Sequence, residues 1–268
     1  MLHRGMAGEE TCGPRQWVSR CQMKEATYHL GKHIASFEFF SWQAMVQANG
    51  AQRIVFDISN PKTSKFDRAN VMNRFRSIIE PGPALAGLPV RYGTPEDGGL
   101  DAVASQFLLW IKSGGRFTRL KTVKPAVPCG FTVTLRNNKD GARGRDSRQE
   151  DWRTFAQEIG AIVIEDWFDK PIHLHDRMAL YAGAKMNFGV CNGPMHMLTL
   201  TEYPVMMFVN TQSARNSQLR WGQEEGQNCP WMLPNQKLVW MKDHIENLRR
   251  AFDGRSSAPS HSADVPKK

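Results

Sequence analysis

The sequence predicts an α/β protein made of two Rossmann-like β/α halves that face each other across a cleft. Three observations predict this fold class. Short apolar runs alternate along the chain with segments of helical periodicity. The runs are continuously apolar, which is typical of parallel strands covered by helices on both faces. A stretch with two prolines and a glycine, residues 124–130 (KPAVPCG), separates an early group of such units from a later one.

The first half spans residues 25–123. Apolar runs predict three strands, at residues 26–30, 53–58 and 89–92. Spacings of three and four between apolar residues predict three helices, at residues 37–47, 67–79 and 100–111. Glycine or proline follows each helix, as expected where a helix ends. We expect this half to form one side of the cleft.

The second half spans residues 130–252 and repeats the strand–helix unit more clearly. Four strands are predicted, at residues 131–135, 161–165, 186–190 and 204–209. Helices are predicted at residues 151–159, at 175–184 and from Pro194 to about Thr201. Because ligands of open parallel sheets bind beyond the carboxyl ends of the strands, we expect the site in the loops that follow them.

The two ends of the chain show no such pattern. Residues 1–24 lack periodicity and are predicted to be an extension. Residues 253–268 are small and polar with two prolines, which predicts a disordered tail. The start of the chain lacks the apolar region of a signal peptide, and no run of 18 apolar residues occurs. We therefore expect a cytoplasmic protein.

Charge and cysteine content narrow the classes of partner. The net charge of +9, from 35 lysines and arginines, favours anionic partners such as a nucleotide-sugar, nucleic acid or an anionic membrane surface. Peripheral contact with such a membrane stays open.

The five cysteines include no CxxC pair, so neither a disulfide framework nor a zinc site is expected. His173 and His175 are two residues apart and would not share a helix face, so no metal site and no cofactor are predicted.

The strongest local signal is a tight turn between a strand and a helix, from Asn192 to His196 (NGPMH). Asn192 suits the N-cap, Gly193 allows close backbone approach to a ligand, and Pro194 suits the first helical turn. The N–H groups of Met195 and His196 would then be free to bind a phosphate. The alternative is a plain strand-to-helix turn.

Basic residues follow the first strand of the second half. The loop 136–148 contains Arg136, Arg143 and Arg145, and arginine forks match phosphate oxygens. The alternative is a solvated basic loop. Asp166 follows the strand 161–165, where a carboxylate could accept hydrogen bonds from a ribose or sugar hydroxyl; the alternative is a residue that only leads into the next helix.

A proton acceptor is expected in the first half. His33 lies in the loop after the first strand, and Glu38 lies about one helical turn beyond it. Either side chain could act as a general base, because each titrates and each would face the second half. The chain contains no GxGxxG, Walker P-loop or GxSxG motif.

The second half also resembles a known family. The stretch 151–209 contains, in order, a helix, the strand IVIED, a helix with ALYAGA, the turn NGPMH and the strand YPVMMF. It is similar to the C-terminal domain of GT-B-fold glycosyltransferases, and to the heptosyltransferase-like group in particular. The Arg136 loop with Ser147, and LVWMKD at 238–243 before a final helix, extend the resemblance from Phe131 to Phe252.

The resemblance implies a function as well as a fold. It implies that Gly193, Pro194, Met195 and His196 hold the diphosphate of a nucleotide-sugar, with Arg136 nearby and without a bound metal. The acceptor would be a glycan or a lipid-linked molecule. The chain departs from the family in its shorter first half, in the absence of a glycine-rich loop at Gly31, and in Asn192, where a small or acidic residue is usual.

Three functions therefore remain as hypotheses. The leading one is a glycosyltransferase. The second is a GT-B-like protein that binds a glycan or nucleotide without catalysis, which donor hydrolysis would distinguish. The third is a basic nucleic-acid-binding protein, which is less favoured because residues 136–148 contain no aromatic side chain for base stacking. Strong salt dependence of binding to arbitrary DNA would support it.

Overall fold

The computed structural model describes residues 25–30, 36–59, 68–93, 104–137, 146–166, 170–220 and 223–256. Within these ranges the chain forms two fully parallel β-sheets, one of three strands and one of five, with helices packed on them. The predicted mixed α/β class with parallel sheets is thus confirmed. No helix in the described ranges is long and apolar enough to cross a membrane.

The smaller sheet has the order β1-β2-β3, with strands β1 (Glu25–His29), β2 (Arg53–Asp57) and β3 (Val90–Tyr92). Its first two strands pair in register from Glu25 opposite Arg53 to His29 opposite Asp57. The helices of this part are α1 (Ser36–Ala48), α2 (Arg68–Arg74), the π-helix η2 (Phe75–Ile79), α3 (Gly82–Ala86) and α4 (Ala104–Lys112).

One predicted helix of this half differs from expectation. Residues 67–79 were expected to form a single α-helix, whereas the structure has α2 followed directly by the π-helix η2. A short helix, α3, follows beyond Pro81, where the chain was expected to leave helical structure. Pro83 lies in its first turn, where proline loses no hydrogen bond, and Gly87 ends it with a left-handed φ of 73°.

The larger sheet has the order β5-β4-β6-β7-β8. Its strands are β4 (Cys129–Arg136), β5 (Ile162–Asp166), β6 (Ala184–Val190), β7 (Val205–Phe208) and β8 (Gln236–Val239). Its helices are α5 (Gln149–Glu158), α6 (Leu174–Ala182), α7 (Gly193–Leu198), α8 (Gln212–Arg220) and α9 (Ile245–Ser256). The helix α8 was not expected. The tail expected from residue 253 is wrong for its first four residues, because α9 continues through them.

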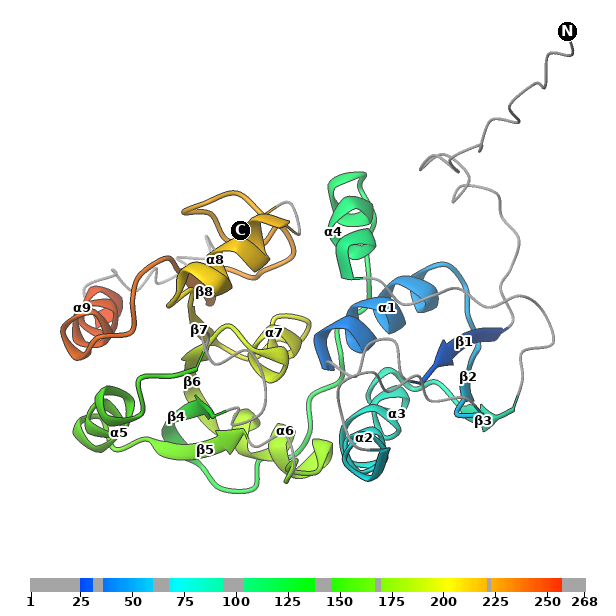
Figure 1. The fold of residues 1–268 in the computed structure, drawn as a ribbon, viewed down its shortest axis with the longest axis horizontal. Helices are drawn as coiled ribbons and strands as arrows, with labels where there is room; N and C mark the ends of the chain where they lie inside the picture. The colour runs from blue at the N-terminus through cyan, green and yellow to red at the C-terminus, as the bar shows by residue number, and fades with distance from the viewer. Residues whose placement is uncertain are drawn as a thin grey trace, which may run out of the picture.

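The two faces of the larger sheet differ in chemistry. Helices α5 and α9 lie on one face of the larger sheet (Figure 1). That face is apolar, and Val133 and Phe188 share one buried cluster with Trp152 and Phe155. The opposite face, toward α6 and α7, carries buried polar groups. There Thr132 Oγ1 donates to Asn187 Oδ1 at 2.6 Å, and the hydroxyls of Thr134 and Tyr181 lie 2.9 Å apart. The side chains of these four residues are thus paired with one another, as stability requires of buried polar groups.

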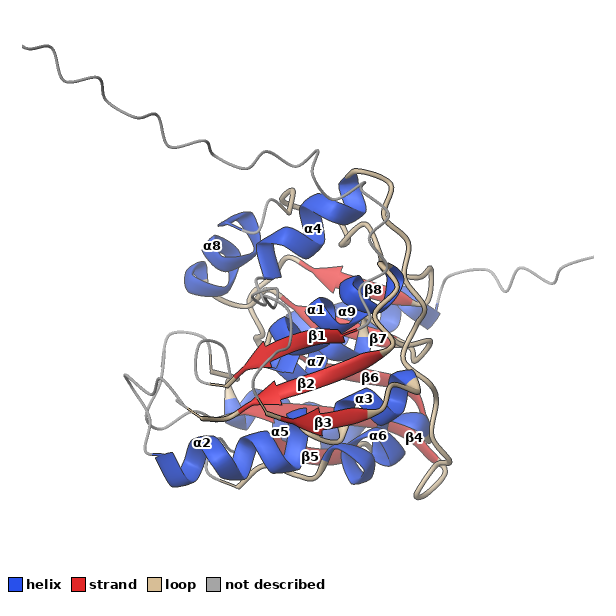
Figure 2. Ribbon diagram, turned by 90° about the vertical axis from the view of Figure 1, so that its right-hand side faces the viewer, coloured by secondary structure: helices blue, strands red, loops and turns tan. Residues whose placement is uncertain are grey.

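The two sheets are joined through helices rather than edge to edge. Figure 2, seen from the side of the smaller sheet, shows that sheet in front, with α1 and α7 between it and the larger sheet. Phe37 in the first turn of α1 lies 5.1 Å from the ring of His196 in α7 and stacks on Trp231 at 5.9 Å. Side chains from both parts form one buried cluster here. At this contact the chain is packed, so an open cleft between the halves stays a prediction.

The connection between the sheets is fixed to α7. The guanidinium of Arg119 donates from Nη1 to the carbonyls of Thr199 and Thr201, at 2.9 and 3.0 Å, and from Nη2 to that of Trp231 at 2.7 Å. Carbonyls at the end of a helix lack partners within it, and a cation there also complements the helix dipole. The basic connector therefore holds the carboxyl end of α7 in place.

Candidate functional site

The strand order of the larger sheet defines where a ligand would bind. The chain leaves β4 for α5 on one face and leaves β6 for α7 on the other, although β4 and β6 are neighbours. This strand order is the flavodoxin-like one. In it, ligands bind at the carboxyl ends of the two neighbouring strands whose following helices lie on opposite faces of the sheet. Thr134 pairs with Gly189, so Arg136 at the end of β4 is level with Cys191. The topology thus brings the predicted Arg136 and Asn192 to one place.

Arg136 is fixed where β4 ends. Its N–H donates to Ser147 Oγ at 2.9 Å, and its carbonyl accepts from Ser147 N at 3.1 Å and Gln149 Nε2 at 3.0 Å. These bonds close the base of the loop that carries Arg143 and Arg145, which lie outside the described residues. The side chain of Arg136 is only 11% exposed, and its Nε lies 3.6 Å from Asp146 Oδ1. By strand alternation it belongs to the face toward α6 and α7, as do Thr132 and Thr134.

The turn before α7 forms as predicted, but its donors are used differently. Asn192 is the N-cap, and its Oδ1 accepts from Met195 N at 2.9 Å. The N–H of His196 donates to the carbonyl of Asn192 at 3.0 Å. The expectation that these two N–H groups are free to bind phosphate is therefore wrong, because the cap and the first helical bond take them. Pro194, in the first turn, has no N–H to offer.

The side chains of α7 face the interior. Met195 is fully buried and His196 is 3% exposed, with its Nε2 2.9 Å from Gln218 Nε2 of α8. Gly193 is half-buried at the start of the helix. Asn192 is 7% exposed, and its amide nitrogen Nδ2 is a buried donor without a hydrogen-bond acceptor. This amide is the group at the turn that best suits a ligand oxygen, because a buried donor without an acceptor is costly.

A buried carboxylate fixes the surroundings of Arg136. Asp243 follows β8 and is 2% exposed. Its Oδ2 accepts from Trp152 Nε1 at 2.8 Å, from Arg148 N at 3.0 Å and from Asn210 Nδ2 at 3.3 Å. The amide of Asn210 also donates to the carbonyl of Asp146 at 3.1 Å. Asp243 thus joins the segments that follow β4, β7 and β8. Its residue type gave no hint of this role, since an aspartate before a helix is usually exposed.

The remaining predicted residues have various outcomes. The backbone of Asp166 ends β5 opposite Arg136, while its side chain lies outside the description. Glu38 is half-buried in the first turn of α1. Burial, and then the charge of Glu38, raises the pKa of Tyr28. His33 lies outside the described residues. The rings of His173 and His175 stack at 5.7 Å, and the described ranges hold no group of three potential metal ligands.

The structure adds a pair that the sequence analysis missed. His29 ends β1 and Asp57 ends β2, and their side chains meet with His29 Nδ1 2.9 Å from Asp57 Oδ2. Asp57 Oδ1 accepts from Ser59 Oγ at 2.6 Å and from Ser59 N at 3.0 Å. These bonds, the Ser59 hydroxyl first, hold the pKa of Asp57 below its usual value. A histidine and an aspartate ending two successive strands was the signal available in the sequence.

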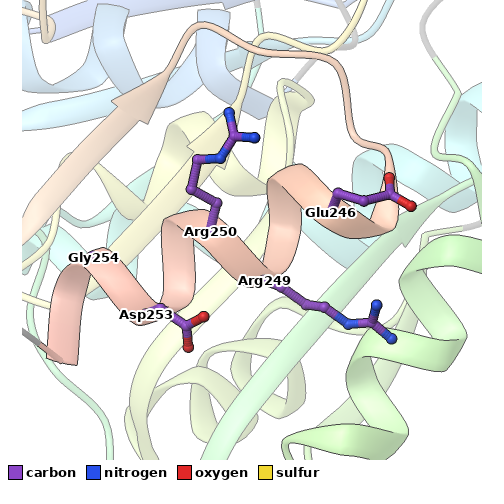
Figure 3. A pocket seen from close by; sticks show the side chains of 5 residues that line it. All are labelled: Glu246, Arg249, Arg250, Asp253 and Gly254. Carbon is purple, nitrogen blue, oxygen red and sulfur yellow. The ribbon is translucent and has the colours of Figure 1, made fainter.

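A surface hollow of about 640 Å³ lies elsewhere, on α9 (Figure 3). Every residue that lines it belongs to this one helix: Glu246, Arg249, Arg250, Asp253 and Gly254. Arg249 pairs with Glu158 of α5, which ties the helix to its neighbour. A hollow formed by one helix surface encloses little of a ligand, so we assign no function to it.

Comparisons with protein-family models, with curated proteins and with solved structures found no match to this chain. The family resemblance of the second half therefore stays a prediction, and the function rests on the geometry at the strand ends.

Proposed function

We propose that this protein is a glycosyltransferase of the GT-B type that moves a sugar from a nucleotide-sugar to a glycan or lipid-linked acceptor. One observation carries the proposal. The strand order places Arg136 and Asn192 together at the point where the chain leaves β4 and β6 toward opposite faces of the sheet. This is the location at which open parallel sheets bind nucleotide ligands.

The donor would bind through groups that the structure leaves suited to oxygen atoms. The fork of Arg136 would hold diphosphate oxygens, and the buried Nδ2 of Asn192 would donate to one of them. Gly193 would let the backbone approach closely. Asp166, level with Arg136, would accept from a ribose or sugar hydroxyl. Met195 and His196 would support the turn rather than contact phosphate, because their N–H groups are occupied.

The reaction would need no metal in this proposal. As the bond between sugar and phosphate breaks, charge develops on the leaving diphosphate, and Arg136 would stabilise it, helped by Arg143 and Arg145 of the same basic segment. The first half would supply the acceptor site and the base. The facing arrangement of the two halves is part of this proposal.

The test is thermal unfolding with UDP, GDP, ADP and CMP, each with and without EDTA. A nucleotide at about 100 times its Kd stabilises the folded state by about 2.7 kcal/mol. In a protein of this size that raises Tm by about 5–10 °C. We expect one nucleotide to give such a shift, unaffected by EDTA and lost in Arg136→Ala.

Arg249→Ala is the matched control, because it removes an arginine paired with Glu158 on the far face of the same sheet. It should keep the nucleotide shift. Each variant is compared with its own melting temperature without ligand. If no nucleotide shifts Tm in the folded wild type, the nucleotide-sugar function is wrong.

A second candidate is a GT-B-like protein that binds a nucleotide or glycan without catalysis. The packed contact between α1 and α7 favours it, because Phe37, His196 and Trp231 fill space between the halves. Release of free nucleotide from nucleotide-sugars distinguishes the two. A protein that binds the nucleotide yet releases none from any donor tested is a binding protein.

A further inference from the structure

The pair of His29 and Asp57 has the arrangement of a general base and its positioning group. His29 Nδ1 lies 2.9 Å from Asp57 Oδ2, and the side chains are 39% and 17% exposed. The other carboxylate oxygen is held by the hydroxyl and the N–H of Ser59. Asp57 is therefore fixed through both oxygens, and it fixes the imidazole ring in turn.

These contacts determine which nitrogen of His29 carries the proton in the neutral ring. A carboxylate only accepts hydrogen bonds, so Nδ1 must be the donor. Nε2 then keeps its lone pair and is the basic atom of the ring. The side chain of His29 is 39% exposed, unlike His196, which is buried against Phe37.

The location of the pair also suits a site. His29 and Asp57 are the last register pair of β1 and β2, at the carboxyl edge of the smaller sheet. Ligands of parallel sheets bind beyond that edge. The chain continues from β1 into α1, whose first turn meets the first turn of α7 through Phe37 and His196. The segments that follow β1 and β6 therefore converge, and β6 leads to the proposed donor site.

We propose that His29 is the general base that activates the acceptor hydroxyl and that Asp57 is its positioning residue. This role rests on the proposed glycosyl transfer. The acceptor O–H bond breaks and its proton goes to Nε2 of His29, while the oxygen forms a bond to the anomeric carbon. The bond from that carbon to the phosphate oxygen breaks, and its electron pair leaves with the nucleotide. The imidazolium afterwards releases the proton to water.

The first test measures hydrolysis of UDP-, GDP-, ADP- and CMP-sugars, in which water takes the place of the acceptor. His29→Asn keeps an N–H that can donate to Asp57 but removes the basic Nε2. We expect it to lower kcat by about 10²–10⁴-fold, the usual contribution of a general base. The Tm shift with nucleotide should stay unchanged, because donor binding lies in the other half. An undiminished kcat in this variant overturns the proposal.

Asp57→Asn tests the positioning role. Its amide can donate to Nδ1, which moves the ring proton to Nε2 and removes the base without removing the imidazole. Arg53→Gln is the matched control, since it breaks the Arg53–Glu25 pair at the opposite end of the same two strands. We expect Asp57→Asn to lose activity as His29→Asn does, and Arg53→Gln to keep it. Equal losses in all three variants would indicate a structural effect and overturn the proposal.

A second measurement needs no sugar donor. Diethyl pyrocarbonate acylates the unprotonated nitrogen of an imidazole, and peptide mass spectrometry follows each histidine separately. We expect His29 to react, and Asp57→Asn to slow it, because the amide would move the ring proton to Nε2 and so occupy the nitrogen that reacts. Exposed His175 of α6 should react equally in both proteins. An unchanged rate at His29 overturns the dyad, even where no nucleotide binds. A slowed rate together with absent nucleotide binding would keep the dyad and discard the sugar donor.

Discussion

The carboxyl edges of the two sheets each carry an aspartate, and the two aspartates differ in what surrounds them. Asp243, at the larger sheet, is 2% exposed and accepts three hydrogen bonds from separate segments. Asp57, at the smaller sheet, is accessible to solvent and bonds one neighbour along the chain and one histidine. The same side chain thus serves to fix loops at one edge and to orient a basic ring at the other.

This difference suits the two functions proposed for the edges, donor binding at the larger sheet and proton transfer at the smaller one. Binding a charged donor benefits from groups that are already in place, because ordering them on binding costs affinity. The network of Asp243 supplies such order around Arg136. Proton transfer needs a group that can take up a proton, and an imidazole oriented by a carboxylate can serve as one. In the proposed function, the environment rather than the residue type distinguishes the two roles.

The largest expected effect comes from removing Phe37, whose ring joins α1 of the first half to α7 of the second. Phe37 is 2% exposed and packs on His196, Trp231 and Phe107. Phe37→Ala should lower the free energy of unfolding by about 4 kcal/mol, because it removes buried surface and leaves a cavity. Urea unfolding followed by tryptophan fluorescence and by circular dichroism measures this loss.

Leu109→Ala is the control for Phe37→Ala, because Leu109 lies on the neighbouring helix α4 and is 63% exposed. It should change stability by no more than about 0.5 kcal/mol. If the two probes give separate transitions in wild type, the parts do not unfold as one unit. A loss below about 1 kcal/mol in Phe37→Ala would mean that the contact with α7 adds little to folding.

The second largest effect is expected from removing the carboxylate of Asp243, the more buried of the two aspartates. Asp243→Ala leaves Trp152 Nε1 and the N–H of Arg148 without their acceptor. Since each buried donor without a partner costs about 1–3 kcal/mol, we expect a loss of about 3 kcal/mol in urea unfolding. The nucleotide shift should also fall, because the loop base beside Arg136 loosens. Asp253→Ala, at an exposed position of α9, should stay within about 0.5 kcal/mol. Similar losses in the two variants would remove the special role of Asp243.

Much of the framework could be predicted from sequence. Apolar runs such as those at residues 53–57 and 162–166 form strands where the sequence pattern places them. The meeting of Arg136 and Asn192 followed from the rule that parallel strands share one carboxyl edge. The use of the Met195 N–H by Asn192 could have been predicted as well, because a capping side chain takes a donor of the first turn.

Other features depend on tertiary structure and were not predictable. His29 meets Asp57 only because β1 and β2 pair in a particular register, which the packing of the whole sheet determines. The burial of Asp243 depends on Trp152 and Asn210, which are distant in sequence. The π-helix after α2 likewise follows from no local pattern, since residues 67–79 have ordinary helical periodicity.

The smallest expected effect concerns how closely α7 approaches the larger sheet. A Cβ at Gly189 of β6 would lie 3.0 Å from Cγ and Sδ of Met195 and 3.1 Å from the carbonyl oxygen of Thr134. The Met195 side chain can move, but the Thr134 carbonyl belongs to the neighbouring strand and cannot. We therefore expect Gly189→Ala to lower the free energy of unfolding by about 2 kcal/mol, the usual cost of overpacking.

Gly130→Ala separates this crowding from the general effect of alanine in a strand. Gly130 lies on the adjacent strand β4, and a Cβ there meets no atom within 4 Å. Since alanine restricts the unfolded chain more than glycine does, this variant should be neutral or more stable by about 0.5 kcal/mol. Because Met195 belongs to the turn that Asn192 caps, Gly189→Ala should also reduce the nucleotide shift, and Gly130→Ala should not. Equal stability of the two variants would show that α7 tolerates displacement. The turn at Asn192 would then not be a preformed part of the proposed donor site.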